Sequence, residues 1–375
     1  MTRLRPRHSV SSMSSIGLLS ASLVACACGA GGAESPPPST PPPTSPPPPP
    51  RYEVHEWGLV RGTLNDHLMI SGPHAPEPVQ VVTKPLLYFH RLDAGEAPLV
   101  VDVQVTIPDG RVVEHWPMTG PVGPTITWAQ VTVGRGTCHG SRYPNPGEEP
   151  CLSLRDGCEA STLAAVETTD ADCLTWPRPP DDEGPTESWN HLFYRGERDT
   201  AAPLPLRLEP QPDGTLRVTS TTTDPIPGRL VRLHHANGLP GASDGITISD
   251  PPAPGASIVM GVPSQPMATG AEALGESLSA AGLSAEEVAA FRRAWDVPLF
   301  GASAIATRAP STEASLTTAT TTPVMTATPM PIATRSILYV LPVASAERVA
   351  ELRLTPAPER IQRAIVMWID EASAP

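Results

Sequence analysis

A strict alternation of apolar residues between positions 99 and 107 constrains the fold of this chain most. Every second residue of the segment is aliphatic: Leu99, Val101, Val103, Val105 and Ile107. Most residues between them are polar. A period of two is that of a β-strand that buries one face. The segment therefore predicts a strand that lies with one face on a hydrophobic core.

Two segments of the chain have the pattern of a β-hairpin. In the first, Pro-Asp-Gly at 108–110 joins the alternating run to residues 111–116. In the second, Pro-Asp-Gly at 212–214 joins residues 204–208 to residues 216–218. A short turn of this composition between two apolar stretches is typical of antiparallel strand pairs. We therefore predict a hairpin at each place.

Further short segments of β type are separated by proline and glycine turns. They are 52–60, 86–90, 125–133, 191–194, 228–233, 246–248, 337–341, 349–354 and 361–369. Many short strands of this kind predict a mainly β fold, either an antiparallel sandwich or a partly closed barrel. The last segment also fits a terminal helix, so its type stays open at this point.

One helical excursion, at about 270–296, interrupts the strands. Ser284 and Glu287 have the spacing of a capping box, in which each side chain satisfies a free backbone N–H of the first turn. We expect this helix to run to about Trp295 and to stop before Pro298. The threonine-rich stretch that follows, at about 302–335, predicts a long exposed loop.

The N-terminus has the pattern of a bacterial lipoprotein signal. Three arginines precede a short apolar stretch that ends in Leu23-Val24-Ala25-Cys26. The apolar stretch is too short to span a bilayer and is typical of a removable signal. We therefore predict a signal peptide at 1–25 and lipidation of Cys26, which would attach the protein to a membrane.

A proline-rich spacer is predicted at 26–51, before an ectodomain at 52–375. Eleven prolines lie between positions 36 and 50. Such a run adopts polyproline II, which rises about 3.1 Å per residue and packs no core. Ala27 is not an aspartate, which would favour retention in the inner membrane, so we expect a lipid-anchored protein of the cell envelope, in the outer membrane.

Four cysteines lie close together in a stretch at about 137–180 that has the character of an insertion. They are Cys138, Cys151, Cys158 and Cys173. An even number of clustered cysteines outside the cytosol is typical of disulfides. A zinc-thiolate site is disfavoured, because no pair has the Cys-x-x-Cys spacing. We therefore predict two disulfides, with three connectivities open.

Several motifs resemble, in their order along the chain, a family of secreted bacterial proteins that begins with a His-Glu-Trp-Gly motif. They are Val-His-Glu-Trp-Gly at 54–58, Lys-Pro-Leu-Leu-Tyr-Phe-His at 84–90, Val-Asp-Val at 101–103, Leu-Phe-Tyr-Arg-Gly at 192–196 and Ile-Leu-Tyr-Val-Leu-Pro at 337–342. Leu59 stands where a threonine is common in that family. The resemblance implies a single domain over most of residues 52–370. Since the family has no established activity, it implies no catalytic residues.

Four residues are candidates for acid-base or metal chemistry: His55, Glu56, His90 and His191. Neighbouring residues of a strand point to opposite faces, so His55 and Glu56 cannot easily share one ion. None of the histidines has a spacing typical of zinc sites. We therefore expect no bound metal or other cofactor, and read these histidines as packed or exposed groups, with His90 the one most suited to a site.

The net charge and the motifs exclude some classes of function, but they do not identify one. The chain has a net charge of −13 over 375 residues, and such an acidic surface repels nucleic acid. An envelope protein or a glycan is a compatible partner. The favoured hypothesis is a binding or structural module of the envelope. The alternative is an envelope hydrolase or a metal-dependent enzyme that uses His55, Glu56 and His90, so catalysis stays undecided.

Overall fold

The computed structural model describes residues 51–371 apart from several short gaps and two long ones. The gaps are 64–79, 94–98, 137, 139–142, 146, 149–150, 154–157, 169, 177–186, 201, 236–243 and 302–334. The predicted signal peptide, the predicted lipidation site Cys26, nearly all of the predicted spacer and nearly all of the threonine-rich stretch lie outside the described residues. Among the residues that are described, no helix has the length and apolar character needed to cross a membrane.

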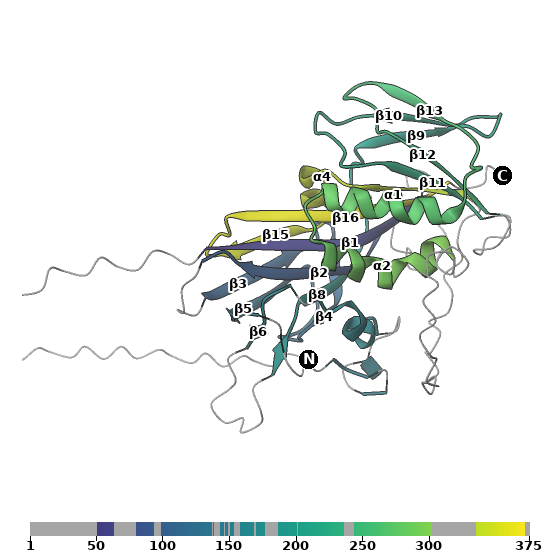
Figure 1. The fold of residues 1–375 in the computed structure, drawn as a ribbon. Helices are drawn as coiled ribbons and strands as arrows, with labels where there is room; N and C mark the ends of the chain where they lie inside the picture. The colour runs from purple at the N-terminus through teal and green to yellow at the C-terminus, as the bar shows by residue number, and fades with distance from the viewer. Residues whose placement is uncertain are drawn as a thin grey trace, which may run out of the picture. The chain divides into compact units, whose positions relative to one another are not determined.

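A mixed sheet of eight described strands forms the centre of the folded domain (Figure 1). Its spatial order is β12 (Gly245–Ser249), β11 (Leu230–His234), β14 (Arg335–Val340), β16 (Arg360–Asp370), β1 (Tyr52–Thr63), β2 (Gln80–Arg91), β8 (Leu192–Arg198) and β4 (Gly110–Trp116). The segment that fitted either a helix or a strand is therefore the strand β16. It pairs in parallel with β1 from Glu53–Arg360 to Thr63–Asp370, whereas the other neighbours in this sheet are antiparallel.

Two smaller sheets cover one face of the central sheet. One contains β15 (Glu351–Thr355), β3 (Leu99–Thr106), β5 (Thr125–Val133), β6 (Leu174–Thr175) and β7 (Ser188–Trp189). The other contains β13 (Ser257–Met260), β10 (Leu216–Ser220) and β9 (Leu206–Pro210). The alternating residues of β3 share a buried core with Val54 and Phe89 of the central sheet. The described fold is therefore mainly β and a sandwich, as predicted, and its sheets do not close into a barrel.

Two helices cover the other face of the central sheet (Figure 1). They are α1 (Met267–Ala280) and α2 (Ala285–Phe300). Their apolar residues, including Leu278 and Phe291, share a second core with Trp57 and Tyr88 of the sheet. The predicted capping box is confirmed, since Ser284 accepts from the Glu287 N–H and Glu287 accepts from the Ser284 N–H.

The end predicted for the second helix was wrong by one turn. Helix α2 continues through Pro298 to Phe300, and Gly301 follows it with a φ of 82°. Proline lacks the backbone N–H that would donate within the helix. Because Pro298 lies in the last turn, this loss affects few helical hydrogen bonds. Leu299 and Phe300 are fully buried in the second core, and this burial favours the last turn. A short helix, α4 (Val343–Val349), follows β14.

One of the two predicted hairpins was wrong, and the other is confirmed. β9 and β10 pair antiparallel around the turn at 212–214. β3 and β4 also flank a turn, but β3 pairs with β5 and β15, while β4 pairs with β8 in the central sheet. The chain changes layers at Ile107, which is buried in the core between the two sheets. Local turn chemistry does not specify which partner a strand finds across the core.

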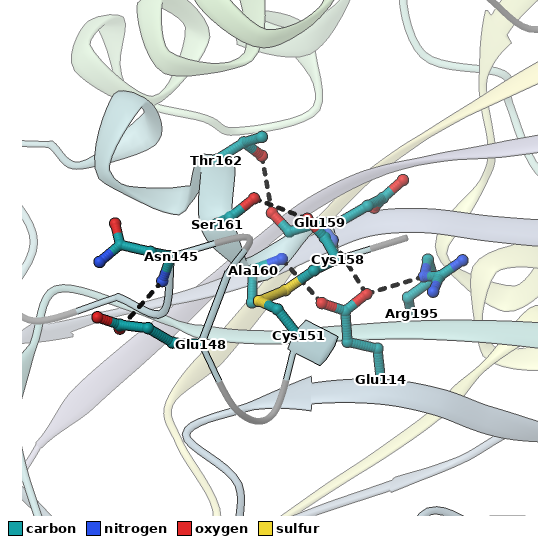
Figure 2. The surroundings of a disulfide bond; sticks show 10 residues. All are labelled: Glu114, Asn145, Glu148, Cys151, Cys158, Glu159, Ala160, Ser161, Thr162 and Arg195. Carbon is teal, nitrogen blue, oxygen red and sulfur yellow. Dashed lines mark hydrogen bonds and ion pairs between the residues drawn. A yellow bond between two sulfur atoms is a disulfide. The ribbon is translucent and has the colours of Figure 1, made fainter. Parts of the chain in front are cut away.

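The four clustered cysteines form two disulfides, Cys138–Cys173 and Cys151–Cys158. The second precedes the 3₁₀ helix η2 (Ala160–Val166) (Figure 2). Beside it, the buried Glu114 carboxylate accepts from the Ala160 N–H at 2.8 Å and from Arg195 Nε at 3.0 Å. The disulfide closes a short loop within this segment, and Glu114 links η2 to β4 and, through Arg195, to β8.

Mapping of the disulfides tests this pairing. Digestion after arginine and glutamate separates the four cysteines onto four peptides, because Arg142, Arg155 and Glu167 lie between them. We expect mass spectrometry without reductant to detect the Cys138 peptide linked to that of Cys173, and the Cys151 peptide linked to that of Cys158. Any other linkage, or alkylation of these thiols before reduction, would contradict the structure.

Candidate functional site

Two histidines from the central sheet meet a glutamate from the helical layer. His55 lies on β1, His90 lies near the end of β2, and Glu287 lies in the first turn of α2. In the β1–β2 register, Glu53 is opposite His90 and Tyr88 is opposite His55, so the two histidines are diagonal neighbours on one face. Their ring centroids are 4.5 Å apart. The face is the one that the helices cover.

The carboxylate of Glu287 contacts both imidazole rings. Its Oε2 lies 2.8 Å from His55 Nδ1, and its Oε1 lies 2.9 Å from His90 Nε2. The same carboxylate accepts from the backbone N–H of Ser284 at 2.9 Å, which is half of the capping box. The cap therefore holds the Glu287 side chain, which is fully buried, toward the sheet. The positive end of the α2 dipole favours the negative charge at this position.

Each histidine has a further acceptor near its second ring nitrogen. His90 Nδ1 lies 3.1 Å from the carbonyl oxygen of Asp170. His55 Nε2 lies 3.5 Å from Oε1 of Glu53, whose other oxygen accepts from Arg360 Nε at 2.9 Å. Because a carbonyl oxygen only accepts, the contact with Asp170 requires a proton on Nδ1 of His90. The ionised Glu287 carboxylate also only accepts, so its contact with Nε2 requires a second proton there, and His90 with both contacts is an imidazolium.

The electrostatics of the cluster favour an ionised carboxylate. Burial alone would raise the pKa of Glu287, but hydrogen bonds from His55 and His90 outweigh it and lower this pKa to about 2. For His90, burial works to lower the pKa, and the Glu287 carboxylate outweighs it, so the pKa of His90 is raised. The site thus joins one carboxylate that stays charged to two imidazole rings.

The structure brings together two of the four residues singled out from the sequence. His55 and His90 meet, and their donor atoms with those of Glu287 all lie within 4.8 Å of one another. Glu56 points to the opposite face of β1, where Tyr194 Oη donates to it at 2.6 Å and Arg363 forms an ion pair with it. A site built from His55, Glu56 and His90 is therefore incompatible with this fold, because the alternation of the strand separates Glu56 from the histidines.

His191 lies outside the cluster, although it is on the same side of the central sheet. Its ring is stacked on Tyr143 and meets the edge of Tyr88, each at a centroid distance of 5.5 Å. Within the described part of the chain, neither ring nitrogen of His191 has a hydrogen-bond partner. Complete burial lowers its pKa to about 3, so the ring is neutral. His191 is therefore a packed core residue in this structure.

Glu287 was missed as a site residue by sequence reasoning. Its position in the Ser284 capping box was recognised, and a capping glutamate has a sufficient structural reason to be there. Glu287 could have been recognised as a site residue only from the position of α2 over β1 and β2. That position depends on contacts between residues 232 apart in the chain, such as His55 and Glu287, and no local pattern specifies it.

Two comparisons with known proteins found no match for this chain. No family model matches the chain. No curated protein is significantly similar to it. Membership of the family with the His-Glu-Trp-Gly motif therefore stays a prediction.

Proposed function

We propose that this chain is a lipid-anchored protein of the cell envelope whose β-sandwich is a binding or structural module. The observation that carries the proposal is the pairing of Cys138, Cys151, Cys158 and Cys173 into two disulfides. Such pairs form and persist in oxidising compartments and are rare in the cytosol. They agree with the export signal and with the lipidation motif that ends at Cys26.

The order of parts along the chain supports display at a distance from the membrane. The proline run follows the predicted lipid attachment site, and the compact unit begins at Pro49. Fifteen residues of polyproline II would span roughly 45 Å. A stiff spacer of this length suits a domain that meets a protein or glycan partner in the envelope. The acidic chain disfavours nucleic acid as that partner.

Replacement of Cys26 tests the anchor. The Cys26→Ser variant lacks the thiol that would carry the lipid, so we expect it to leave the membrane fraction and to appear in the soluble envelope fraction. Cys28→Ser is the matched control, because it removes a neighbouring thiol and leaves the motif at 23–26 intact. Cell fractionation with immunodetection measures both variants. If the Cys26→Ser protein stays in the membrane fraction, the lipoprotein hypothesis is wrong.

A metal-dependent enzyme is the second candidate function. The convergence of His55 and His90 on one carboxylate favours it, with Glu287 in the place that the sequence had suggested for Glu56. Metal content is the property that separates this candidate from a module without a metal centre. A metal-free protein that is fully folded and binds no ion would exclude it.

A further inference from the structure

We infer that His55, His90 and Glu287 form a binding site for one divalent transition-metal ion of the zinc and iron(II) type. The inference does not depend on the proposed anchoring and display, and it deepens the second candidate function by naming the metal site that such an enzyme would need. It rests on the positions of three donor atoms, on the groups that orient them and on the access to them.

The donor atoms are placed as a metal ion requires. The Nδ1 of His55 and the Nε2 of His90 lie 2.8 and 2.9 Å from the two oxygens of Glu287. An ion about 2.0–2.1 Å from each donor keeps neighbouring donors roughly 2.9–3.4 Å apart. The separation of 2.9 Å is at the lower end of this range and that of 2.8 Å is just below it, and all three donor atoms lie within 4.8 Å of one another. Small rotations of the three side chains would therefore admit the ion without a change in the backbone.

The surrounding contacts are those that orient metal ligands. A histidine ligand commonly donates its second ring N–H to a carbonyl or a carboxylate, which selects its tautomer. His90 has the Asp170 carbonyl in this position, whereas His55 Nε2 lies 3.5 Å from Glu53 and has no hydrogen-bond partner among the described residues. The Asp170 contact keeps one proton of His90 on Nδ1, so a metal ion would replace the proton that Nε2 donates to Glu287. The Ser284 N–H in turn orients the Glu287 carboxylate.

The charge and the exposure of the site suit a cation. Glu287 supplies a buried negative charge, and Glu53 supplies a second one nearby, which Arg360 shares from the rim. The side chains of His55 and His90 are 9% and 13% exposed, so the cluster reaches the surface on the histidine side. An ion can therefore enter past the two imidazole rings, although the carboxylate itself is covered.

The donor set indicates the class of ion. Two imidazole nitrogens with one carboxylate suit zinc, iron(II) and their neighbours, whereas magnesium and calcium prefer oxygen ligands only. Thiolate-binding ions are disfavoured, because the four cysteines of the described domain are in disulfides. Three protein ligands leave at least one coordination position for water or for an external ligand. A site of this kind can bind a ligand atom directly at the metal.

Metal titration of the full-length, tag-free protein in detergent tests the site. After treatment with a chelator, we expect it to bind one equivalent of Zn²⁺ by elemental analysis, with at least tenfold tighter binding than Mg²⁺. Substitution with Co²⁺ should give visible absorption bands of nitrogen and oxygen coordination. The melting temperature should rise with Zn²⁺ in the wild type, because the ion binds the folded state.

Three variants make the test specific. Glu287→Gln and His90→Gln should each weaken Zn²⁺ binding at least a hundredfold and abolish the cobalt spectrum. His90→Gln leaves the capping box intact, so it keeps the test valid if Glu287→Gln unfolds α2. Glu286→Gln is the matched control, since Glu286 is exposed beside Glu287, and it should bind like the wild type.

Two results would overturn the inference. One is a folded wild-type protein that takes up no stoichiometric Zn²⁺ or Co²⁺, in which case the two imidazoles and the carboxylate form only a structural hydrogen-bond cluster. The other is unchanged binding in both Glu287→Gln and His90→Gln, which would place the ion elsewhere. Neither result bears on the anchor, which the Cys26→Ser fractionation tests separately.

Discussion

Replacement of Glu56 by alanine is expected to lower the free energy of unfolding by about 3–5 kcal/mol. Glu56 and Arg363 form an ion pair between β1 and β16 in which both side chains are fully buried. Removal of one partner leaves the other charge buried, and its desolvation is then uncompensated. The loss of Glu56 also removes the acceptor of the Tyr194 hydroxyl, which donates to it at 2.6 Å.

The remaining contacts of Arg363 limit this loss. Its Nη1 also donates to Glu347 at 2.6 Å and to the carbonyl of Ala350 at 2.8 Å. Glu347 is partly exposed, however, so water weakens its field at Arg363. The arginine therefore keeps some hydrogen bonding but loses the carboxylate that shares its buried environment.

Chemical denaturation followed by tryptophan fluorescence measures the effect. Glu359→Ala is the control, because Glu359 pairs with Arg51 where both side chains are exposed, and little change is expected. Glu56→Gln should lie between alanine and wild type, since the amide oxygen can still accept from Tyr194. Equal stability of Glu56→Ala and Glu359→Ala would show that the buried pair contributes nothing.

Acidification from pH 7 to pH 5 is expected to destabilise the protein by about 4 kcal/mol through two buried histidines. Burial lowers the pKa of His191 to about 3 and that of His115 to about 4. In the unfolded chain both rings titrate near 6.5, so the unfolded state binds more protons below that pH. Each ring then costs about 1.4 kcal/mol of stability per pH unit until its folded pKa is reached.

Other groups act in different pH ranges or with the opposite sign. The lowered pKa of Glu287, about 2, costs stability only as the pH falls below the ordinary range of a glutamate. The raised pKa of His90 has the opposite sign, because it adds stability as the pH falls toward that of a free histidine. The net slope is thus a sum, and a variant is needed to isolate one residue.

The His191→Phe variant isolates one of the two histidine contributions. Phenylalanine keeps a ring between Tyr88 and Tyr143 and does not titrate. We expect its loss of stability between pH 7 and pH 5 to be smaller than that of the wild type by about 2 kcal/mol. Denaturant titrations at pH 5, 6 and 7 measure the difference. A variant with the same pH slope as the wild type would show that His191 is protonated in the folded state or already titrates with a low pKa when unfolded.

Local patterns of the chain predicted much of the secondary structure. The period of two at 99–107 is β3, the spacing of Ser284 and Glu287 is a capping box, and the turn at 212–214 joins two paired strands. These features depend on neighbours within a few residues, because side-chain alternation, turn chemistry and helix capping are local effects. The same alternation separates His55 from Glu56, as the structure shows.

Partners that are distant in the chain could not be predicted in this way. The alternating strand β3 does not pair with β4, its expected hairpin partner. The chain passes from one sheet to the other at the buried Ile107, so the two strands lie in different sheets. The choice between a strand and a helix for β16 depended on β1, some 300 residues earlier, which offers a parallel partner along the whole segment. Pairing of this kind is decided by the burial of complete faces, and no single segment carries that information.

Local sequence patterns were sufficient to predict the β character of the chain, the residues that share a strand face, and the four cysteines available for pairing. The connectivity of the disulfides and the contact of His55 and His90 with Glu287 became known only from the fold. The physical reason is that strand register and helix packing place side chains from β1, β2 and α2 within hydrogen-bonding distance, although up to 232 residues separate them in the chain.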